Sequence, residues 1–273
     1  MSLSDIHPVV ITRDAARTIE QTLASLAAFP RVTVYDNGST DATVELCERF
    51  PNTRVVTGEF FGFGSTYNHA ADLAAGDWIL SIHADEHVSG ELVASLAALE
   101  LADPATAYAF ERHNLFMGKD MRWAGWGKHW MVRLYNRRTT RFNDAPVHEK
   151  LQLPGNAKVA HVRGTFWHDA VTDIDQFLQK VSHHTELRRH SRGRTLRPGV
   201  ILVRAWWAFF RTYIVQLGVL EGWRGMVIAV SNANGSFYKH MKRYVDANLA
   251  KEQRQAGLVP AARSASPPSV KVP

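Results

Sequence analysis

The sequence predicts an α/β fold built on a mostly parallel, doubly wound sheet. Over about the first hundred residues, short β-rich runs alternate with segments of helical pattern. Strands separated by helices of this length form parallel sheets, because a parallel pair needs a long crossover connection. The chain has 273 residues, of which 45% are hydrophobic, so it can bury a substantial core in one or two domains.

The first half of the sequence gives four predicted strands, with a helix after each of the first three. In chain order these elements are the strand 7–12, the helix 14–28, the strand 31–36, the helix 40–50, the strand 53–56, the helix 66–76 and the strand 77–82. Ligands of such sheets bind beyond the carboxyl ends of the strands. The residues that follow each strand are therefore the first candidates for a site.

The pattern changes after residue 104. Two longer strands are predicted at 106–116 and 130–136, around the Gly/Trp-rich turn WAGWGKHW. A helix over about 173–190 then leads to an aromatic and basic segment at 200–244. The tail, 251–273, contains the run LVPAARSASPPSVKVP, whose composition predicts disorder.

Charge and cysteine content narrow the function classes. The net charge of +6 is uneven, since residues 176–254 carry 14 Lys/Arg and only 4 Asp/Glu. A basic segment of this kind predicts docking to an anionic partner, either nucleic acid or anionic lipid. The lone Cys47 fits a reducing compartment, and the N-terminal residues do not have the pattern of a secretory signal.

The stretch SIHADEHVSG allows two enzymatic interpretations. His83, Glu86 and His87 give the H-x-x-E-H order of an inverted zinc protease motif, which works only on a helix. Here the pentad follows an apolar predicted strand, and Ser89 is a plausible N-cap for the next helix. The pentad is therefore predicted on a strand-to-helix loop, which favours a carboxylate loop that holds a metal and a diphosphate. A merely polar loop is the third alternative.

Two further loops support the carboxylate interpretation. Thr12-Arg13-Asp14 follows the first strand, and Asp36-Asn37-Gly38-Ser39-Thr40-Asp41 follows the second. With the HADE loop, three consecutive loops at the carboxyl ends of strands carry Asp. Such an edge can hold a ribose, a base and a metal-bound diphosphate together.

On these residues the chain resembles the family-2 glycosyltransferases of the nucleotide-diphospho-sugar (GT-A) fold, from about residue 7 to 245. It looks most similar to the bacterial branch that builds the lipopolysaccharide inner core, the β-1,4-glucosyltransferase-like branch. The stretches that carry the resemblance are VVITRDAARTIEQTLASL, VYDNGSTDATVELCERF, GFGSTYNHAADLAAGDWILSIHADE, VRLYN and PVHE.

The resemblance implies a donor site. Thr12 and Asp14 would line the nucleoside pocket, and Asp36 would accept a hydrogen bond from the base. Asp85 matches the last Asp of the family's DxD motif, the ligand to Mg²⁺ or Mn²⁺. Arg133, in VRLYN, matches a basic position that faces the diphosphate, and its structural alternative is an exposed strand arginine.

Several matches leave alternatives open. His83 replaces the first Asp of the usual D-A-D-E, so it could contact ribose, bind the metal or have no ligand role. His168 matches a family histidine that closes the donor site or approaches the metal, and a structural histidine is the alternative. Gly64 and Asn68 match the family's G-F-G-x-x-x-N, where glycine allows close approach to sugar or phosphate, although a plain turn has the same pattern.

The catalytic base is assigned from the same resemblance. Direct displacement at an anomeric carbon needs a carboxylate that takes the proton of the acceptor hydroxyl. Glu149, in the P-V-H-E motif, is the candidate, and His148 would orient it or contact the acceptor. Glu86 and Asp144 are alternatives for the base, and a surface pair with Lys150 is the alternative for Glu149.

The resemblance also implies a domain plan. Residues 1–170 would form the catalytic domain, with a nucleotide-sugar half at about 1–103 and an acceptor half at about 104–170. Residues 171–250 would form an amphipathic, membrane-proximal helical extension. Within it, segment 199–218 is predicted to be an interfacial helix, because Arg204 and Arg211 share one face and aromatic residues the other. A helix packed in the core is the alternative.

The sequence thus predicts an inverting glycosyltransferase that moves a hexose from a nucleotide-diphosphate sugar to a lipid-linked saccharide such as lipopolysaccharide core. It would work in the cytoplasm, on the inner face of the cytoplasmic membrane. The first alternative is a sugar nucleotidyltransferase, but TRDAARTIEQ lacks the Gly-rich, basic loop that grips a triphosphate. The second is a nucleic-acid-binding protein, for which the basic segment offers no recognisable module.

Overall fold

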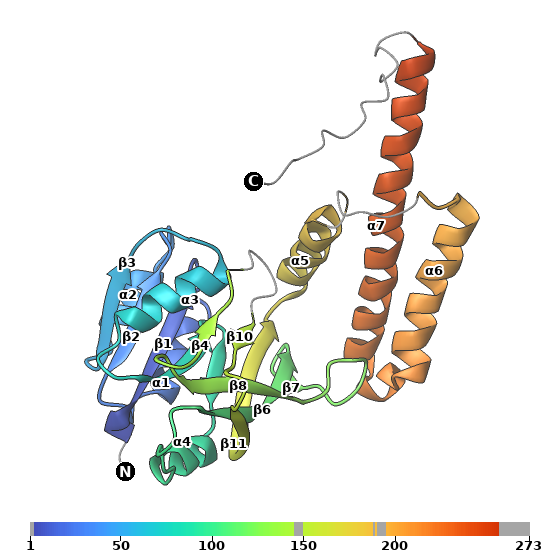
Figure 1. Ribbon diagram of the computed structural model, residues 1–273. Helices are drawn as coiled ribbons and strands as arrows, with labels where there is room; N and C mark the ends of the chain where they lie inside the picture. Colours follow the sequence, from blue (N-terminus) through green and yellow to red (C-terminus); the bar gives the residue numbers. More distant parts are fainter. Residues whose placement is uncertain (1–2, 145–149, 188, 190–194, 257–273) are drawn as a thin grey trace. The chain divides into compact units, whose positions relative to one another are not determined.

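The computed structural model describes residues 3–144, 150–187, 189 and 195–256. The chain divides into two compact units (Figure 1). The first, here called the sheet unit, comprises Met1–Arg122 and Trp126–Thr172. The second, here called the helical unit, comprises Trp123–Gly125 and Asp173–Pro273.

The first half of the sheet unit is the predicted doubly wound part. Its four strands are parallel in the order β3-β2-β1-β4. The strands are β1 (Ile6–Thr12), β2 (Val32–Asp36), β3 (Thr53–Thr57) and β4 (Trp78–His83), and a short 3-10 helix, η1 (Leu3–Asp5), precedes them. The connecting helices are α1 (Ile19–Ser25), α2 (Thr43–Glu48) and α3 (Phe63–Asp72). Thr12 pairs with Asp36 and Ile11 with His83, so the three predicted site loops leave the sheet at one edge.

Antiparallel strands extend the sheet beyond β4 and make it mixed. The path continues β4-β8-β6-β11-β5, in which only β6 and β11 run parallel. These strands are β5 (Glu86–Val88), β6 (Thr106–Phe116), β8 (His129–Asn136) and β11 (Lys158–Val171). The short strand β7 (Lys119–Asp120) pairs with β6, and β9 (Arg141–Phe142) with β10 (Leu151–Gln152). The segment after β4 was predicted as a loop, but it contains β5, because β5 pairs with the distant β11.

Two apolar clusters pack on the sheet. The larger holds residues of α1, α2 and the helix α4 (Gly90–Ala97), among them Leu23, Leu46 and Leu92. The smaller holds Tyr67 and other residues of α3. Neighbouring strand residues enter different clusters, as Val10 and Val9 do, because successive side chains of a strand point to opposite faces.

The start of α4 is fixed by the predicted cap. The Ser89 hydroxyl accepts a hydrogen bond from the Leu92 N–H at 3.1 Å, and it satisfies a donor that the first helical turn leaves free. The Ser89 side chain also accepts the Thr165 N–H at 3.0 Å, which ties the helix start to β11.

The described residues of the helical unit form three α-helices, with two irregular turns between the second and the third. They are α5 (Ile174–Leu187), α6 (Pro198–Phe210), the π-helical turn η2 (Arg211–Val215), the 3-10 turn η3 (Gly218–Glu221) and α7 (Trp223–Gln255). Helices α6 and α7 lie side by side (Figure 1).

The predicted helix at 199–218 begins at Pro198, but its α-helical part ends at Phe210. Leu217 then adopts the left-handed conformation (φ 55°), and a Cβ added to Gly218 would lie 2.7 Å from the Thr212 carbonyl oxygen. Helix α7 continues to Gln255, past residue 250, and residues 257–273 of the tail lie outside the described residues. In the part of the chain that the structure describes, none of the helices combines the length and apolarity needed to span a bilayer.

Candidate functional site

The loop after β2 is held by Asp36. This carboxylate is 1% exposed and accepts the N–H groups of Gly38 and Ser39 at 3.0 Å each, as well as the Ser39 hydroxyl. This pattern is an Asx-type turn, in which the side chain fixes its own loop. Asp36 therefore shapes the edge of the predicted nucleoside pocket, and its bond to a base stays a prediction.

The loops after β1 and β2 are cross-linked. Asp14 lies in the left-handed region (φ 50°), where its carboxylate accepts the Thr40 N–H at 2.7 Å and the Thr40 hydroxyl at 3.1 Å. The Asp14 N–H in turn donates to the Ser39 hydroxyl at 2.9 Å. The hydrogen bond from the Thr40 N–H lowers the pKa of Asp14, so this carboxylate is charged at neutral pH.

Thr12 ends β1 beside these two loops. Its hydroxyl is buried and has no hydrogen-bond partner among the described residues, whereas its carbonyl accepts two bonds from Asn37. A buried hydroxyl without a partner is costly, so such a group usually faces a ligand or an ordered water. This observation supports Thr12 as a donor contact.

Gly64 and Asn68 take part in packing instead. A Cβ on Gly64 would lie 1.9 Å from the carbonyl oxygen of Asn143, so only glycine allows α3 to approach that segment. The Asn68 amide donates to the Phe142 carbonyl and accepts the Phe142 N–H, both at 2.9 Å. The structure thus gives both residues the role of joining α3 to β9, and a donor contact for either stays a prediction.

Glu86 lies at the centre of a buried ionic cluster. Its carboxylate accepts from the Arg133 guanidinium at 2.6 Å and from the His83 N–H at 2.9 Å, and the Nε atom of Arg112 is 3.7 Å away. Burial alone would raise the pKa of Glu86, but Arg133, His83 and Arg112 lower it overall. Because Glu86 is fully buried and charged with both oxygens engaged, the geometry argues against Glu86 as the catalytic base.

The structure contradicts two alternatives that the sequence left open. Arg133 is 3% exposed, so the interpretation as an exposed strand arginine is wrong. His83 ends β4 and Glu86 begins β5, so the pentad is not helical and the zinc-protease interpretation is wrong as well.

His83 belongs to the same cluster. Its Nε2 atom lies 3.3 Å from an Arg133 nitrogen, and its ring stacks on Tyr67 with centroids 5.6 Å apart. Burial lowers the pKa of His83 to about 4, so the ring is neutral at neutral pH. A guanidinium only donates, so Nε2 uses its lone pair on Arg133. A ribose or metal contact of His83 stays a prediction.

Asp85 and His168 face each other across the loop after β4. The Nε2 atom of His168 is 3.4 Å from a carboxylate oxygen of Asp85. The Asp169 N–H donates to the Asp85 carbonyl at 2.8 Å, and His168 pairs with Glu86 in the sheet. The pairing of β5 with β11 therefore brings together two residues that are 83 positions apart in the sequence.

This pair fits a divalent cation. A carboxylate oxygen and an imidazole nitrogen are both suitable ligands for Mn²⁺, and bonds of about 2.1 Å to each atom can bridge a separation of 3.4 Å. Among residues 3–144, 150–187, 189 and 195–256, no three His, Cys, Asp or Glu side chains gather into a ready metal site. The pair would thus leave most positions to diphosphate oxygens and water, as is usual for Mg²⁺.

Two residues of β6 complete the surroundings of His168, and sequence reasoning missed both. Asn114 Oδ1 lies 2.9 Å from His168 Nδ1, and the Arg112 guanidinium also contacts this nitrogen. The available signal was the polar run Glu111 to Asn114, in which Arg112 and Asn114 share one face of the predicted strand. The sequence could not show that both residues contact His168, because this contact depends on the pairing of β6 with β11.

The predicted acceptor side is described only in part. Glu149 and His148 lie outside the described residues, so the structure gives no position for the predicted base. Asp144, an alternative for that role, is exposed and accepts a bond from the Ser65 hydroxyl at 3.2 Å.

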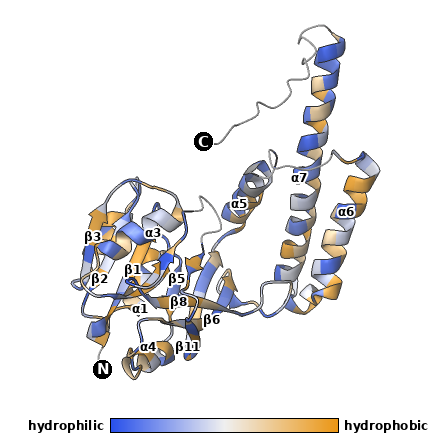
Figure 2. Ribbon diagram, in the orientation of Figure 1, coloured by the Kyte–Doolittle hydropathy of each residue, from blue (hydrophilic) through white to orange (hydrophobic). Residues whose placement is uncertain are grey.

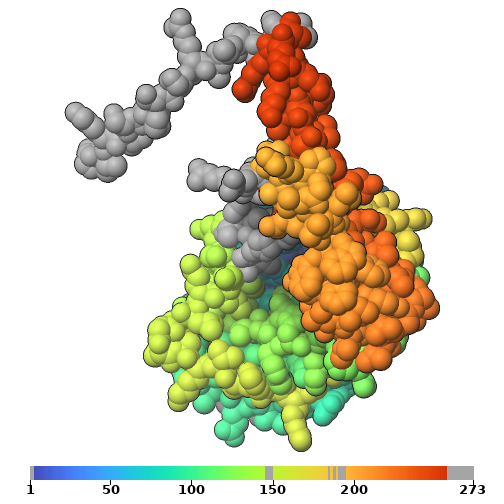
Figure 3. All heavy atoms as spheres, turned by 90° about the vertical axis from the view of Figure 1, so that its right-hand side faces the viewer, coloured from blue at the N-terminus to red at the C-terminus, as the bar shows by residue number. Residues whose placement is uncertain are grey.

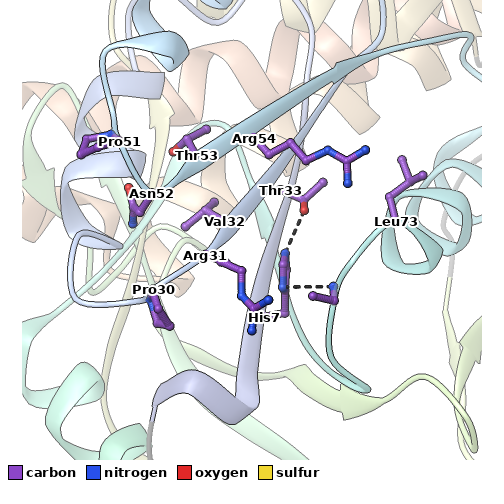
Figure 4. Close-up of a pocket in the computed structure, with 11 residues that line it drawn as sticks. His7, Pro30, Arg31, Val32, Thr33, Pro51, Asn52, Thr53, Arg54 and Leu73 are labelled. Atoms are coloured by element: carbon purple, nitrogen blue, oxygen red, sulfur yellow. Dashed lines mark hydrogen bonds between the residues drawn. The ribbon is translucent and has the colours of Figure 1, made fainter.

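A hollow of about 360 Å³ lies at the opposite, amino-terminal ends of β1 to β3 (Figure 4). There, the Nε2 atom of His7 forms a hydrogen bond with the Thr33 hydroxyl at 2.8 Å. The Asn52 side-chain amide donates to the carbonyls of Leu26 and Phe29. These contacts join strands and loops of the sheet unit. The hollow is therefore structural and separate from the candidate site.

Comparisons with known proteins bear on the family of the chain. The sequence profile described as Glycosyl transferase family 2 matches residues 9–152. An uncharacterized glycosyltransferase of Rickettsia prowazekii (strain Madrid E) is 23% identical over 257 residues, which cover 88% of this chain and 87% of the relative. One of Rickettsia bellii (strain RML369-C) is 25% identical over 254 residues, with coverages of 87% and 85%.

Solved structures show lower similarity. S. aureus TarS 1–349 has a TM-score of 0.42 at 14% identity, covering 94% of this chain and 92% of that one. GalNAc-T7 with UDP, GalNAc and Mn²⁺ has a TM-score of 0.44 at 12% identity, with coverages of 60% and 43%. The profile match spans most of the sheet unit, and the fold is the predicted GT-A fold with a C-terminal helical part. The chain belongs to glycosyl transferase family 2 and is a glycosyltransferase.

Proposed function

We propose that this glycosyltransferase is inverting and cation-dependent, and that it moves a hexose from a nucleotide-diphosphate sugar to a lipid-linked saccharide such as lipopolysaccharide core. The observation that carries the proposal is the pair Asp85 and His168, whose carboxylate oxygen and Nε2 atom lie 3.4 Å apart. Glu86, which follows Asp85 in the sequence, bonds the buried Arg133. Neither a sugar nucleotidyltransferase nor a nucleic-acid-binding protein fits membership of this family.

The donor would lie on the edge where β1, β2 and β4 end. Thr12, Asp14 and Asp36 would receive the nucleoside, since the two cross-linked loops lie there with the Thr12 hydroxyl, which has no partner in the described part of the chain. Arg133, held in place by Glu86, would face the diphosphate. Asp85 and His168 would hold Mg²⁺ or Mn²⁺, which supplies charge neutralisation for the departing diphosphate.

The acceptor hydroxyl would attack the anomeric carbon from the side opposite the diphosphate, which inverts the configuration. Glu149 would take the proton of that hydroxyl. This assignment rests on the PVHE motif alone, because these residues lie outside the described part of the chain.

The helical unit supports a membrane-bound acceptor. Leu202, Val203, Trp206 and Trp207 on α6 are 59%, 64%, 62% and 52% exposed, so this face is not part of a core in the described residues. Helix α6 lies at the front of Figure 3, and hydrophobic residues colour part of its ribbon in Figure 2. Arg204 and Arg211 are exposed beside this face. A helix with this distribution lies in a membrane interface. These exposures support the proposal that residues 171–250 bind the inner face of the cytoplasmic membrane. We propose that residues 1–170 form the catalytic domain.

The test is a transfer assay with purified protein and a panel of UDP, GDP, TDP and CMP sugars, with and without Mn²⁺. Acceptors would be truncated lipopolysaccharide core and the same saccharide without lipid. We expect transfer from one donor class, with inverted configuration, to the lipid-linked acceptor, and loss of Mn²⁺-dependent donor binding in Asp85→Asn. Transfer that is equal in Asp85→Asn and parent, with or without Mn²⁺, would contradict the proposed site.

A further inference from the structure

The Nδ1 atom of His168 faces two groups that make opposite demands. Asn114 Oδ1, at 2.9 Å, only accepts hydrogen bonds, so it requires a proton on Nδ1. The Arg112 guanidinium, which also contacts Nδ1, only donates, so it requires a lone pair there. A neutral imidazole can satisfy one of the two at a time.

The orientation of the Asn114 amide is fixed independently. Its Nδ2 donates to the Trp126 carbonyl at 3.0 Å, and a flipped amide would place two acceptors against each other. The Asn114 carbonyl accepts the Met121 N–H at 3.0 Å, which holds the backbone at this point. Oδ1 is therefore kept toward His168.

Each tautomer of His168 gives a different Nε2 atom. With the proton on Nδ1, bonded to Asn114, Nε2 presents a lone pair toward Asp85, which is what a cation ligand needs. With the proton on Nε2, Arg112 donates to Nδ1, and the Nε2–H points at the Asp85 oxygen 3.4 Å away. The second arrangement suits a site without a cation.

Arg112 is placed to alternate between partners. Its side chain is 14% exposed, its Nε atom is buried without a hydrogen-bond partner among the described residues, and its nearest carboxylate, Glu86, is bonded at 2.6 Å to Arg133. Another of its nitrogens contacts the Met131 sulfur at 3.1 Å, a weak acceptor. Arg112 thus has fewer strong partners than Arg133.

We propose that Asn114 is a positioning residue that selects the cation-binding tautomer of His168, and that Arg112 holds the opposite tautomer when no cation is bound. The inference rests on the proposed function in its use of Asp85 and His168 as cation ligands. It adds to the site two residues of β6 that act through His168.

The first test is a titration with Mn²⁺ alone, followed by electron paramagnetic resonance of the free ion. Asn114→Leu should weaken Mn²⁺ binding about 10- to 100-fold, the usual effect of losing the partner that orients a histidine ligand. Asn114→Asp keeps an acceptor for Nδ1–H but places a second oxygen against the Trp126 carbonyl, so it should bind Mn²⁺ more tightly than Asn114→Leu and more weakly than the parent. Asn52→Leu is the matched control, since Asn52 also bonds backbone carbonyls but lies at the other end of the sheet, and it should bind like the parent.

The second test reads the tautomer itself by ¹⁵N histidine NMR on the cation-free and Mg²⁺-loaded protein. The parent should move from Nε2–H to Nδ1–H on loading, and Arg112→Met should show Nδ1–H even without a cation. A parent that binds no Mn²⁺, an Asn114→Leu variant that binds as tightly as the parent, or an unchanged tautomer in Arg112→Met would each overturn the inference. Neither test needs sugar transfer, so failure of the proposed function would leave these results interpretable.

Discussion

A single buried carboxylate, Glu86, organises the charged part of the site. It bonds Arg133 and the His83 N–H and faces Arg112, so three site residues depend on it although it faces no solvent. Sequence reasoning named His83, Asp85 and Arg133 through the family motifs, but it considered Glu86 only as part of a zinc-protease motif or as an alternative base. The burial of Glu86 and its pairing with Arg133 and Arg112 depend on how the strands are arranged in space. The local sequence around Glu86 does not show this arrangement.

Glu86→Gln tests this role. Two guanidinium groups would lose their carboxylate in a buried place, so the free energy of unfolding should fall by about 3–5 kcal/mol. The pKa of Glu86 is lowered in the folded state, so its contribution is present above the unfolded value and is lost as the pH falls through the folded value. Urea unfolding at pH 7 and at acid pH should therefore show a difference that narrows in acid. Glu45→Gln, which breaks an exposed pair with Arg49, should change stability by no more than about 0.5 kcal/mol, and equal losses in both variants would contradict the prediction.

His7 gives a second residue-scale prediction. Burial, helped by Arg31, lowers the pKa of His7 to about 4 from 6.5, so the unfolded chain takes up this proton before the folded protein does. The free energy of unfolding should therefore decrease as the pH falls from about 6.5 to about 4, by roughly 2–3 kcal/mol from this group. His7→Gln should show a shallower slope over that window in urea unfolding. If the free energy of unfolding changed with pH to the same extent in the parent and in His7→Gln, the prediction for His7 would be wrong.

At the scale of elements, the sequence predicts the positions of most strands and helices. The strand 106–116 agrees with β6 at both ends, and 130–136 differs from β8 by one residue. These segments have strong local patterns. The short strand β5 and the end of α6 at Phe210 were not predicted. The first depends on pairing with β11, and at the second the chain passes into the π-helical turn η2.

Gly64 offers a prediction at this scale. Gly64→Ala would place a methyl group within 1.9 Å of the Asn143 carbonyl oxygen, so α3 and β9 must move apart. We expect a loss of about 1–3 kcal/mol in the free energy of unfolding, measured by urea denaturation. Gly90→Ala is the control, since its Cβ meets no atom within 4 Å, and it should be neutral or slightly stabilising. If Gly90→Ala lowered the free energy of unfolding and Gly64→Ala did not, the packing argument would be wrong.

At the scale of the whole molecule, charge and apolar exposure gather in the C-terminal third of the sequence. Residues 176–254 hold 14 of the 32 Lys and Arg, and α6 to α7 hold most of the exposed large apolar side chains. The structure also distinguishes exposed from half-buried aromatic residues on α6. Trp206 and Trp207 are exposed, whereas Phe209 and Phe210 are half-buried.

The interfacial prediction is therefore tested on Val203, Trp206 and Trp207. Replacing all three with Ser should remove most of the protein from anionic liposomes in a sedimentation assay, while nucleotide-sugar binding by the sheet unit is kept. Trp130→Ser, which changes an exposed tryptophan of the sheet unit, serves as the control and should sediment like the parent. Unchanged sedimentation of a folded triple variant would show that α6 does not bind lipid.

The cross-linked loops after β1 and β2 have a consequence for the thermodynamics of donor binding. Asp14 and Asp36 already fix the backbone of Gly38, Ser39 and Thr40 through bonds from each N–H. The conformational entropy of ordering these residues is thus lost during folding, before any nucleotide arrives. Association at this edge should involve little further ordering of the backbone, and the amide hydrogens of these three residues should exchange slowly with solvent even in the free protein.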